Sequence, residues 1–262
     1  MPRPKFLISL LFVLVFFLIF LVFFVRLNYV VPIVMYHSIT PLGKYENRLT
    51  VTRETFERQM RFLKTHKYNV VPLEDLIPLL KEKKIPSKTI AITIDDGYKD
   101  NYAYAFPILK KYNIPATIFI IVNEVGREQN DRLSWDEIKE MAESGIIAIG
   151  SHCLGPEPLI NLKSDEALKE EIFASKRILE EKLGKEIDTF AYPGGMFNGK
   201  IRQLVIDAGY KLAVSTNPGK EYSRDDVFAL KRLRISENAK NLFVFWFETT
   251  GFYTFMKEHR HK

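Results

Sequence analysis

The chain alternates between short apolar runs and longer stretches in which apolar residues recur every three or four positions. The first pattern predicts β-strands and the second predicts amphipathic helices. The expected strands are residues 30–36, 69–71, 89–94, 115–122, 146–150, 188–192, 211–216 and 231–235. The expected helices are residues 56–63, 73–83, 134–145, 164–183, 200–208 and 238–251.

This repeated strand–helix order predicts a parallel sheet, because parallel neighbours are joined by right-handed crossovers that carry a helix. Seven or eight strands in about 230 residues fit a barrel or a distorted barrel. A doubly wound open sheet is the alternative, and no glycine-rich nucleotide-binding loop supports it.

The N-terminal segment is apolar on every face. Residues 6–25 are interrupted only by Ser9, and a bilayer-spanning helix needs about 20 such residues. The bulky residues 23–25 offer no signal-peptidase site, so we expect an uncleaved anchor over residues 1–27. The flanking cations Arg3 and Lys5 favour a cytoplasmic N-terminus. We therefore expect a single-pass plasma-membrane protein whose domain, residues 28–262, lies on the extracytoplasmic side.

Composition narrows the partners further. The net charge is +6, spread along the chain, and it suits anionic surfaces such as lipid headgroups or cell-wall polymers. No nucleic-acid-binding motif accompanies this charge. The single cysteine, Cys153, cannot form an internal disulfide, and we expect it to be a small packing residue.

Polar residues follow the predicted strands at the ends where βα barrels carry their active sites. Asp95 and Asp96 end the third strand, and His37 and His152 follow two others. The Asp-Asp-Gly sequence alone is also typical of a turn, but a helical pattern follows it rather than a returning strand. We therefore expect these side chains to meet on one rim of the barrel.

Carboxylates and imidazoles together suit Zn²⁺ or a similar divalent cation that keeps one position open for water. Such a cation lowers the pKa of bound water to about 7. A second carboxylate beside it can accept the proton of that water. The residue types therefore predict metal-assisted hydrolysis of an amide or an ester.

Four segments resemble the motifs of the polysaccharide deacetylases, the NodB-homology or carbohydrate esterase 4 family. Residues 93–97 resemble the TFDDG motif, and residues 149–152 resemble the start of the H-[ST]-x-x-H motif. Residues 190–195 resemble the YPxG motif, and residues 31–38 resemble the opening strand of the membrane-bound and secreted branch. The resemblance covers about residues 31–236.

The resemblance implies a distorted (β/α)7 barrel that removes N-acetyl groups from a GlcNAc-containing cell-wall or extracellular polysaccharide. It implies that Asp95 is the general base and that Asp96 and His152 bind the metal. Tyr192 is expected to stabilise the oxyanion through its backbone N–H. We also expect Tyr36, Gly194 and Arg234, at strand ends, to contact the substrate.

Two departures from the family pattern affect the expected metal and proton donor. Pro156 stands where the second motif histidine is expected, and it has no ligand atom. Glu157, His37 or water are the alternatives for the third metal ligand. The late Leu-x-His motif has no match either, which leaves His37 as the candidate proton donor. These departures raise an alternative function, a barrel of this family that binds glycan without hydrolysing it.

Overall fold

The computed structural model describes residues 4–27, 29–41, 49–127, 129, 131–216, 222–223 and 226–254. The strands of its main sheet are β1 (Ile33–Tyr36), β4 (Asn69–Val70), β5 (Thr89–Ile94), β6 (Ala116–Ile120), β7 (Ile147–Ser151), β8 (Thr189–Ala191), β9 (Leu212–Ser215), β10 (Leu230–Lys231) and β11 (Leu233–Arg234). A second, two-stranded sheet pairs β2 (Ser38–Thr40) with β3 (Thr50–Thr52). The sequence pattern had not predicted this small sheet, because strands of three residues show too little alternation.

The helices are α1 (Pro4–Leu27), α2 (Arg53–Thr65), α3 (Leu76–Glu82), α4 (Phe106–Tyr112), α5 (Trp135–Glu143), α6 (Asp165–Lys169), α7 (Ser175–Leu183), α8 (Gly199–Asp207) and α9 (Leu242–Glu248). Two π-helical turns interrupt this regular pattern. One, at Asn101–Ala105, precedes α4, and the other, at Glu170–Ala174, joins α6 to α7. The predicted helix over residues 164–183 is therefore confirmed, with a widened turn at its centre.

The main sheet is a nearly closed parallel barrel, as the sequence predicts. Its strand order is β10-β9-β8-β7-β6-β5-β1-β11, and β4 adds to the start of β5. Leu230 and Lys231 pair with β9, whereas Leu233 and Arg234 pair with β1. The two ends of the order are thus pieces of one short strand, separated by a single residue, and this strand closes the barrel. The open-sheet alternative is wrong.

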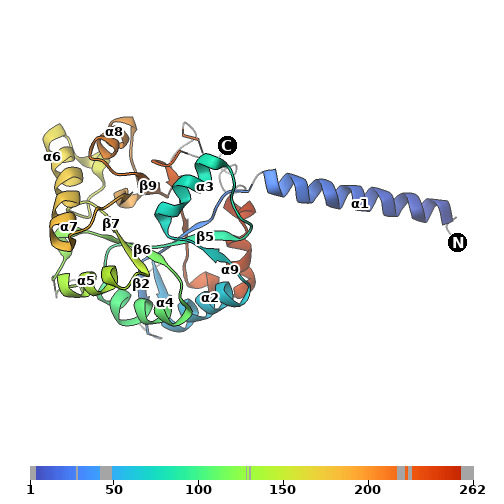
Figure 1. Ribbon diagram of the computed structural model, residues 1–262, viewed down its shortest axis with the longest axis horizontal. Coiled ribbons are helices and arrows are strands. Elements are labelled where there is room, and N and C mark those ends of the chain that lie inside the picture. Colours follow the sequence, from blue (N-terminus) through green and yellow to red (C-terminus); the bar gives the residue numbers. More distant parts are fainter. Residues whose placement is uncertain are drawn as a thin grey trace.

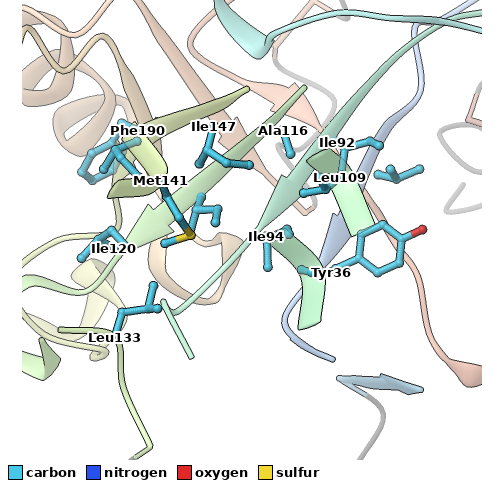
Figure 2. Packing of buried hydrophobic residues seen from close by; sticks show 14 of the residues in the cluster. Tyr36, Ile92, Ile94, Leu109, Ala116, Ile120, Leu133, Met141, Ile147 and Phe190 are labelled. Carbon is cyan, nitrogen blue, oxygen red and sulfur yellow. The ribbon is translucent and has the colours of Figure 1, made fainter. Parts of the chain in front are cut away.

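Two layers of side chains fill the molecule. Successive strand residues point to opposite faces, so one set faces the helices and the other fills the barrel. The outer set includes Tyr36, Ile92 and Ile94, which belong to one cluster with Leu109 of α4 (Figure 2). The inner set comprises Ile33, Ala91, Phe119, Ala191, Leu212, Val214 and Leu230, and Val31, Leu73 and Leu76 from outside the strands pack with it. The barrel is therefore packed inside and leaves only its rim for a site.

Helix α1 projects from the barrel as a single rod, whereas α2, α4, α5 and α7 surround the strands (Figure 1). Its described side chains, those of residues 11–20 and 23–24, are exposed. Within the described ranges of the chain, no helix combines the length and the apolarity that crossing a membrane requires. The predicted anchor stays a prediction.

Candidate functional site

The residues that follow the strands meet at one cleft, at the carboxyl ends of the barrel strands. The cleft has a volume of about 520 Å³. Its lining includes most of the predicted site residues, namely His37, Asp95, Asp96, His152, Tyr192, Gly194 and Arg234. The expectation that these groups share one rim is confirmed, and the cleft lies over the packed interior of the barrel.

Asp95, at the end of β5, is buried and held by an arginine. Arg232 donates from Nη1 to Oδ1 of Asp95 at 2.6 Å and from Nη2 to Oδ2 at 2.7 Å. Both side chains are nearly inaccessible to solvent, at 1% and 3% exposure. Burial is the largest single influence on the pKa of Asp95 and by itself would raise it, but the charge of Arg232, its hydrogen bonds and the nearby His152 and His37 together lower that pKa. Asp95 is therefore ionised at neutral pH.

Arg232 occupies the one-residue break between β10 and β11, and it is not among the site residues predicted from the sequence. Its guanidinium also lies 5.5 Å from the ring centre of Phe119, inside the barrel. The neighbouring Arg234 is exposed and lines the cleft. The signal that could have found Arg232 is its two-residue spacing from Arg234, because alternate strand residues share a face.

His37 follows β1 directly and lies beside Asp95. Its Nε2 is 4.0 Å from Oδ2 of Asp95, so the two groups are close without a direct hydrogen bond. Burial lowers the pKa of His37, and the charge of Asp95 partly offsets that effect. The structure therefore brings the predicted proton acceptor and the predicted proton donor together.

Asp96 and His152 form a second pair in the cleft. Nε2 of His152 lies 3.6 Å from Oδ1 of Asp96, and its Nδ1 lies 2.7 Å from the carbonyl oxygen of Ala191. A carbonyl only accepts, so Nδ1 carries the proton that this hydrogen bond needs. A neutral imidazole then turns the lone pair of Nε2 toward a carboxylate oxygen. The lone pair of Nε2 and the negative carboxylate oxygen repel each other. A cation between these two atoms would bind to both, so this pair of side chains fits a metal ion.

The backbone of Asp96 is fixed in an unusual conformation. Its φ of 74° lies in the left-handed region, which an aspartate tolerates better than most residues. Arg132 donates from Nη1 to the carbonyl oxygen of Asp96 at 2.8 Å, and its guanidinium stacks on the Tyr98 ring. This support turns Asp95 and Asp96 toward different partners although they are adjacent in the chain.

The expected third ligand does not join this pair. Glu157 is exposed, accepts a hydrogen bond from Asn161 and does not line the cleft. Pro156 lines the cleft but offers no ligand atom. Among the described residues, no group of three or more histidine, cysteine, aspartate or glutamate side chains is arranged to hold a metal.

Two predicted roles are wrong. Tyr36 is fully buried, and its hydroxyl donates to Gln59, because alternation along β1 turns it toward the helices. It therefore cannot contact the substrate. The backbone N–H of Tyr192, expected to face the oxyanion, donates instead to the carbonyl oxygen of Val214. Its hydroxyl donates to Phe228, so Tyr192 forms part of the wall of the cleft.

Comparisons with known proteins agree with this geometry. The family model described as polysaccharide deacetylase matches residues 82–213, about half of the chain. YxkH of Bacillus subtilis, assigned by its name to the polysaccharide deacetylases, is 35% identical over 206 residues, covering 78% of this chain and 71% of the relative. The poly-β-1,6-N-acetyl-D-glucosamine N-deacetylase of Staphylococcus aureus is 30% identical over 200 residues, which cover 72% of this chain and 69% of the relative.

Among solved structures, the Streptococcus pyogenes deacetylase PplD in complex with acetate is similar, with a TM-score of 0.74 and 29% identity. The match covers 82% of this chain and 97% of that structure. The chain belongs to the polysaccharide deacetylase family, and it is a hydrolase of non-peptide carbon–nitrogen bonds.

The Asp95–Arg232 pair predicts how the pH profile responds to mutation. Arg232→Lys keeps a positive charge but loses the two-pronged contact, so the pKa of Asp95 should rise. Since the expected base acts only when ionised, the acidic limb of the kcat/KM profile should move to higher pH. Arg234→Lys, two residues away and exposed, is the matched control and should leave that limb in place. An unmoved limb in Arg232→Lys would contradict the role of the pair.

Proposed function

We propose that this protein removes N-acetyl groups from a GlcNAc-containing cell-wall or extracellular polysaccharide. The observation that carries the proposal is the ionised Asp95, held by Arg232 and lying beside His37 in an open cleft. The S. aureus relative, named for poly-β-1,6-N-acetyl-D-glucosamine, supports this substrate class. The cleft volume of about 520 Å³ is of the size that small ligand sites have.

The proposed reaction uses the two groups at the centre of the cleft. Asp95 accepts a proton from the water that attacks the acetyl carbonyl carbon. Asp95 passes this proton to His37, whose Nε2 is 4.0 Å away. His37 delivers it to the amide nitrogen as the carbon–nitrogen bond breaks, which leaves a free amine on the sugar and releases acetic acid, which ionises to acetate. Asp95 and His37 are then both in their starting states. Arg234 and Gly194, at the cleft wall, are positioned to contact the sugar.

We further propose that Asp96 and His152 bind a divalent cation, of which Zn²⁺ suits this pair of ligand types. Such a cation would polarise the acetyl carbonyl and stabilise the negative charge that develops on its oxygen. The hydrogen bond from Nδ1 of His152 to Ala191 is the kind of second contact that orients a metal-binding histidine. Two protein ligands leave the remaining positions to water and substrate.

A second candidate function follows from Pro156. With two protein ligands instead of three, affinity for the cation falls, and a barrel that binds glycan without hydrolysing it becomes the competing proposal. The neighbouring side chains favour hydrolysis, because Asp95 lies beside His37 in the cleft and glycan binding alone needs no adjacent proton acceptor and proton donor.

Acetate release distinguishes these two functions. The full-length protein, supplied with Zn²⁺ and acetylated oligomers of β-1,6- and β-1,4-linked glucosamine, should release acetate. Asp95→Asn keeps the shape of the side chain but loses the proton acceptor, and should lower the rate by about 10² to 10⁴. Dialysis against a chelator should lower it too, with recovery on adding Zn²⁺. Binding of the oligomers without acetate above the Asp95→Asn level would establish the glycan-binding function instead.

Zinc affinity tests the pair of ligands separately from catalysis. Pro156→His adds an imidazole to the cleft wall beside His152 and should strengthen zinc binding by about 10-fold or more in calorimetry. Glu157→Gln should leave zinc binding unchanged, since Glu157 lies outside the cleft. Loss of zinc binding in Glu157→Gln would show instead that the glutamate moves in to complete the site.

We also propose that the apolar N-terminal run holds the protein at the plasma membrane, with the barrel on the extracytoplasmic side. The support comes from residues 6–25 and from the exposed side chains of α1. The hydroxyl of Tyr29, two residues after α1, donates to the carbonyl of Thr89 at the start of β5. This contact fixes the segment after α1 at the end of the barrel opposite the cleft, so the cleft would face away from the bilayer.

Fractionation of cells that express the full-length chain tests this location. The protein should remain in the membrane pellet after alkaline carbonate extraction. Replacing Leu14 and Leu18 with lysine, at about 2.5–3.5 kcal/mol per charge at the centre of a bilayer, should release it. External protease should digest the barrel in intact spheroplasts. Recovery of the unmodified protein in the carbonate supernatant would contradict the proposal.

A further inference from the structure

We infer that Asn101 and Asp100 are positioning residues for His37, and that they fix the proton donor through its backbone. The inference rests on the proposed role of His37. It assigns a function to the segment that follows the Asp-Asp-Gly motif, which neither the motif nor the predicted site included. Asp100 directly precedes the π-helical turn before α4, and Asn101 is the first residue of that turn.

The imidazole of His37 has little to hold it directly. Its Nδ1 is buried and has no hydrogen-bond partner among the described residues. Its Nε2 lies 4.0 Å from Asp95, beyond hydrogen-bonding distance. Catalytic histidines are usually oriented by a hydrogen bond to the second ring nitrogen. The orientation of this ring therefore depends on the backbone that carries it.

The backbone around His37 is held at three successive residues by one segment, residues 95–101. The carbonyl of Tyr36 accepts from the backbone N–H of Asp95 at 3.0 Å. The carbonyl of His37 accepts from Nδ2 of Asn101 at 2.8 Å. The hydroxyl of Ser38 donates to Oδ2 of Asp100 at 2.5 Å. Residues 95–101 thus contact the chain before, at and after the imidazole.

The two positioning residues also hold each other. Nδ2 of Asn101 donates to Oδ1 of Asp100 at 2.8 Å, in addition to its bond to His37. The carboxylate of Asp100 is further bonded to the backbone of Ile39. Asn101 is fully buried and Asp100 is 9% exposed. Since a buried hydrogen-bonded network of this kind is rigid, a displacement of either residue would be transmitted to His37.

The local backbone is specialised at this point. Near its start, after helical residues 99 and 100, the helix has a π-helical turn in which the N–H of Phe106 bonds to the carbonyl of Asn101. Such turns are rare and occur often at functional sites. The same seven-residue segment begins with Asp95, directly after β5, and continues to Asn101. It therefore sets the separation between the proton acceptor and the proton donor within one short segment.

A double-mutant cycle in the full-length protein tests this inference. Asn101→Ala should lower kcat for acetate release by about 10- to 100-fold, because a displacement near 1 Å can cost this much, and should leave KM within about twofold. His37→Ala should lower kcat further. In the His37→Ala background, Asn101→Ala should have no additional effect, because no proton donor remains to be positioned.

Controls separate positioning from general damage. Thr249→Ala removes a buried hydroxyl at the end of α9 and should lower the melting temperature while leaving kcat unchanged. If Asn101→Ala does not fold, Asp100→Asn, which keeps the size of the side chain, replaces it in the double-mutant cycle with His37→Ala. The same dependence of kcat on His37 is then expected. An equal loss of kcat with and without His37 would overturn the inference. A His37→Ala variant with full activity would instead refute the proposed role of His37 itself.

Discussion

The structure depends on one buried ion pair, between Asp95 and Arg232. Two charges inside a barrel cost several kcal/mol to remove from water, and only a well-formed contact repays that cost. The planar guanidinium supplies it, because two parallel N–H groups match the two oxygens of the carboxylate. Arg232 reaches this position from the break in the strand that closes the barrel. Closure of the fold and ionisation of the proposed base are therefore two results of the same contact.

Asp96 and His152 form a pair with a different charge balance, although Asp96 is adjacent to Asp95 in the chain. The left-handed backbone of Asp96 turns it away from Arg232 and toward His152. Among the described residues no guanidinium pairs with its carboxylate, and the imidazole faces it with a lone pair once Nδ1 is bonded to Ala191. One carboxylate is thus neutralised by Arg232, and the proposed cation would neutralise the other. The Asp-Asp-Gly sequence looks symmetrical, but the fold separates the two groups by their partners.

Part of this arrangement could be predicted from the sequence. The alternation of strands and helices, the parallel sheet and the rim carrying His37, Asp95, Asp96 and His152 follow from local periodicity and from where each apolar run ends. The errors involve contacts that local patterns do not contain. Tyr36 is next to His37, yet alternation turns it to the opposite face of β1. The N–H of Tyr192 is used by a neighbouring strand, and Arg232 lies in a break between two-residue strands too short to show a period.

Two different constraints fix the positions of the proposed proton acceptor, Asp95, and the proposed proton donor, His37. Asp95 is fixed by its side chain, through Arg232, whereas His37 has no ring contact of that kind and is fixed by its backbone. A base must be ionised when the water binds, and the charge of Arg232 favours that form. A proton donor must both take up and release a proton during each cycle, and a fixed charged partner on its ring would favour one of the two states. Anchoring His37 through its carbonyl keeps its place in the cleft without fixing its protonation.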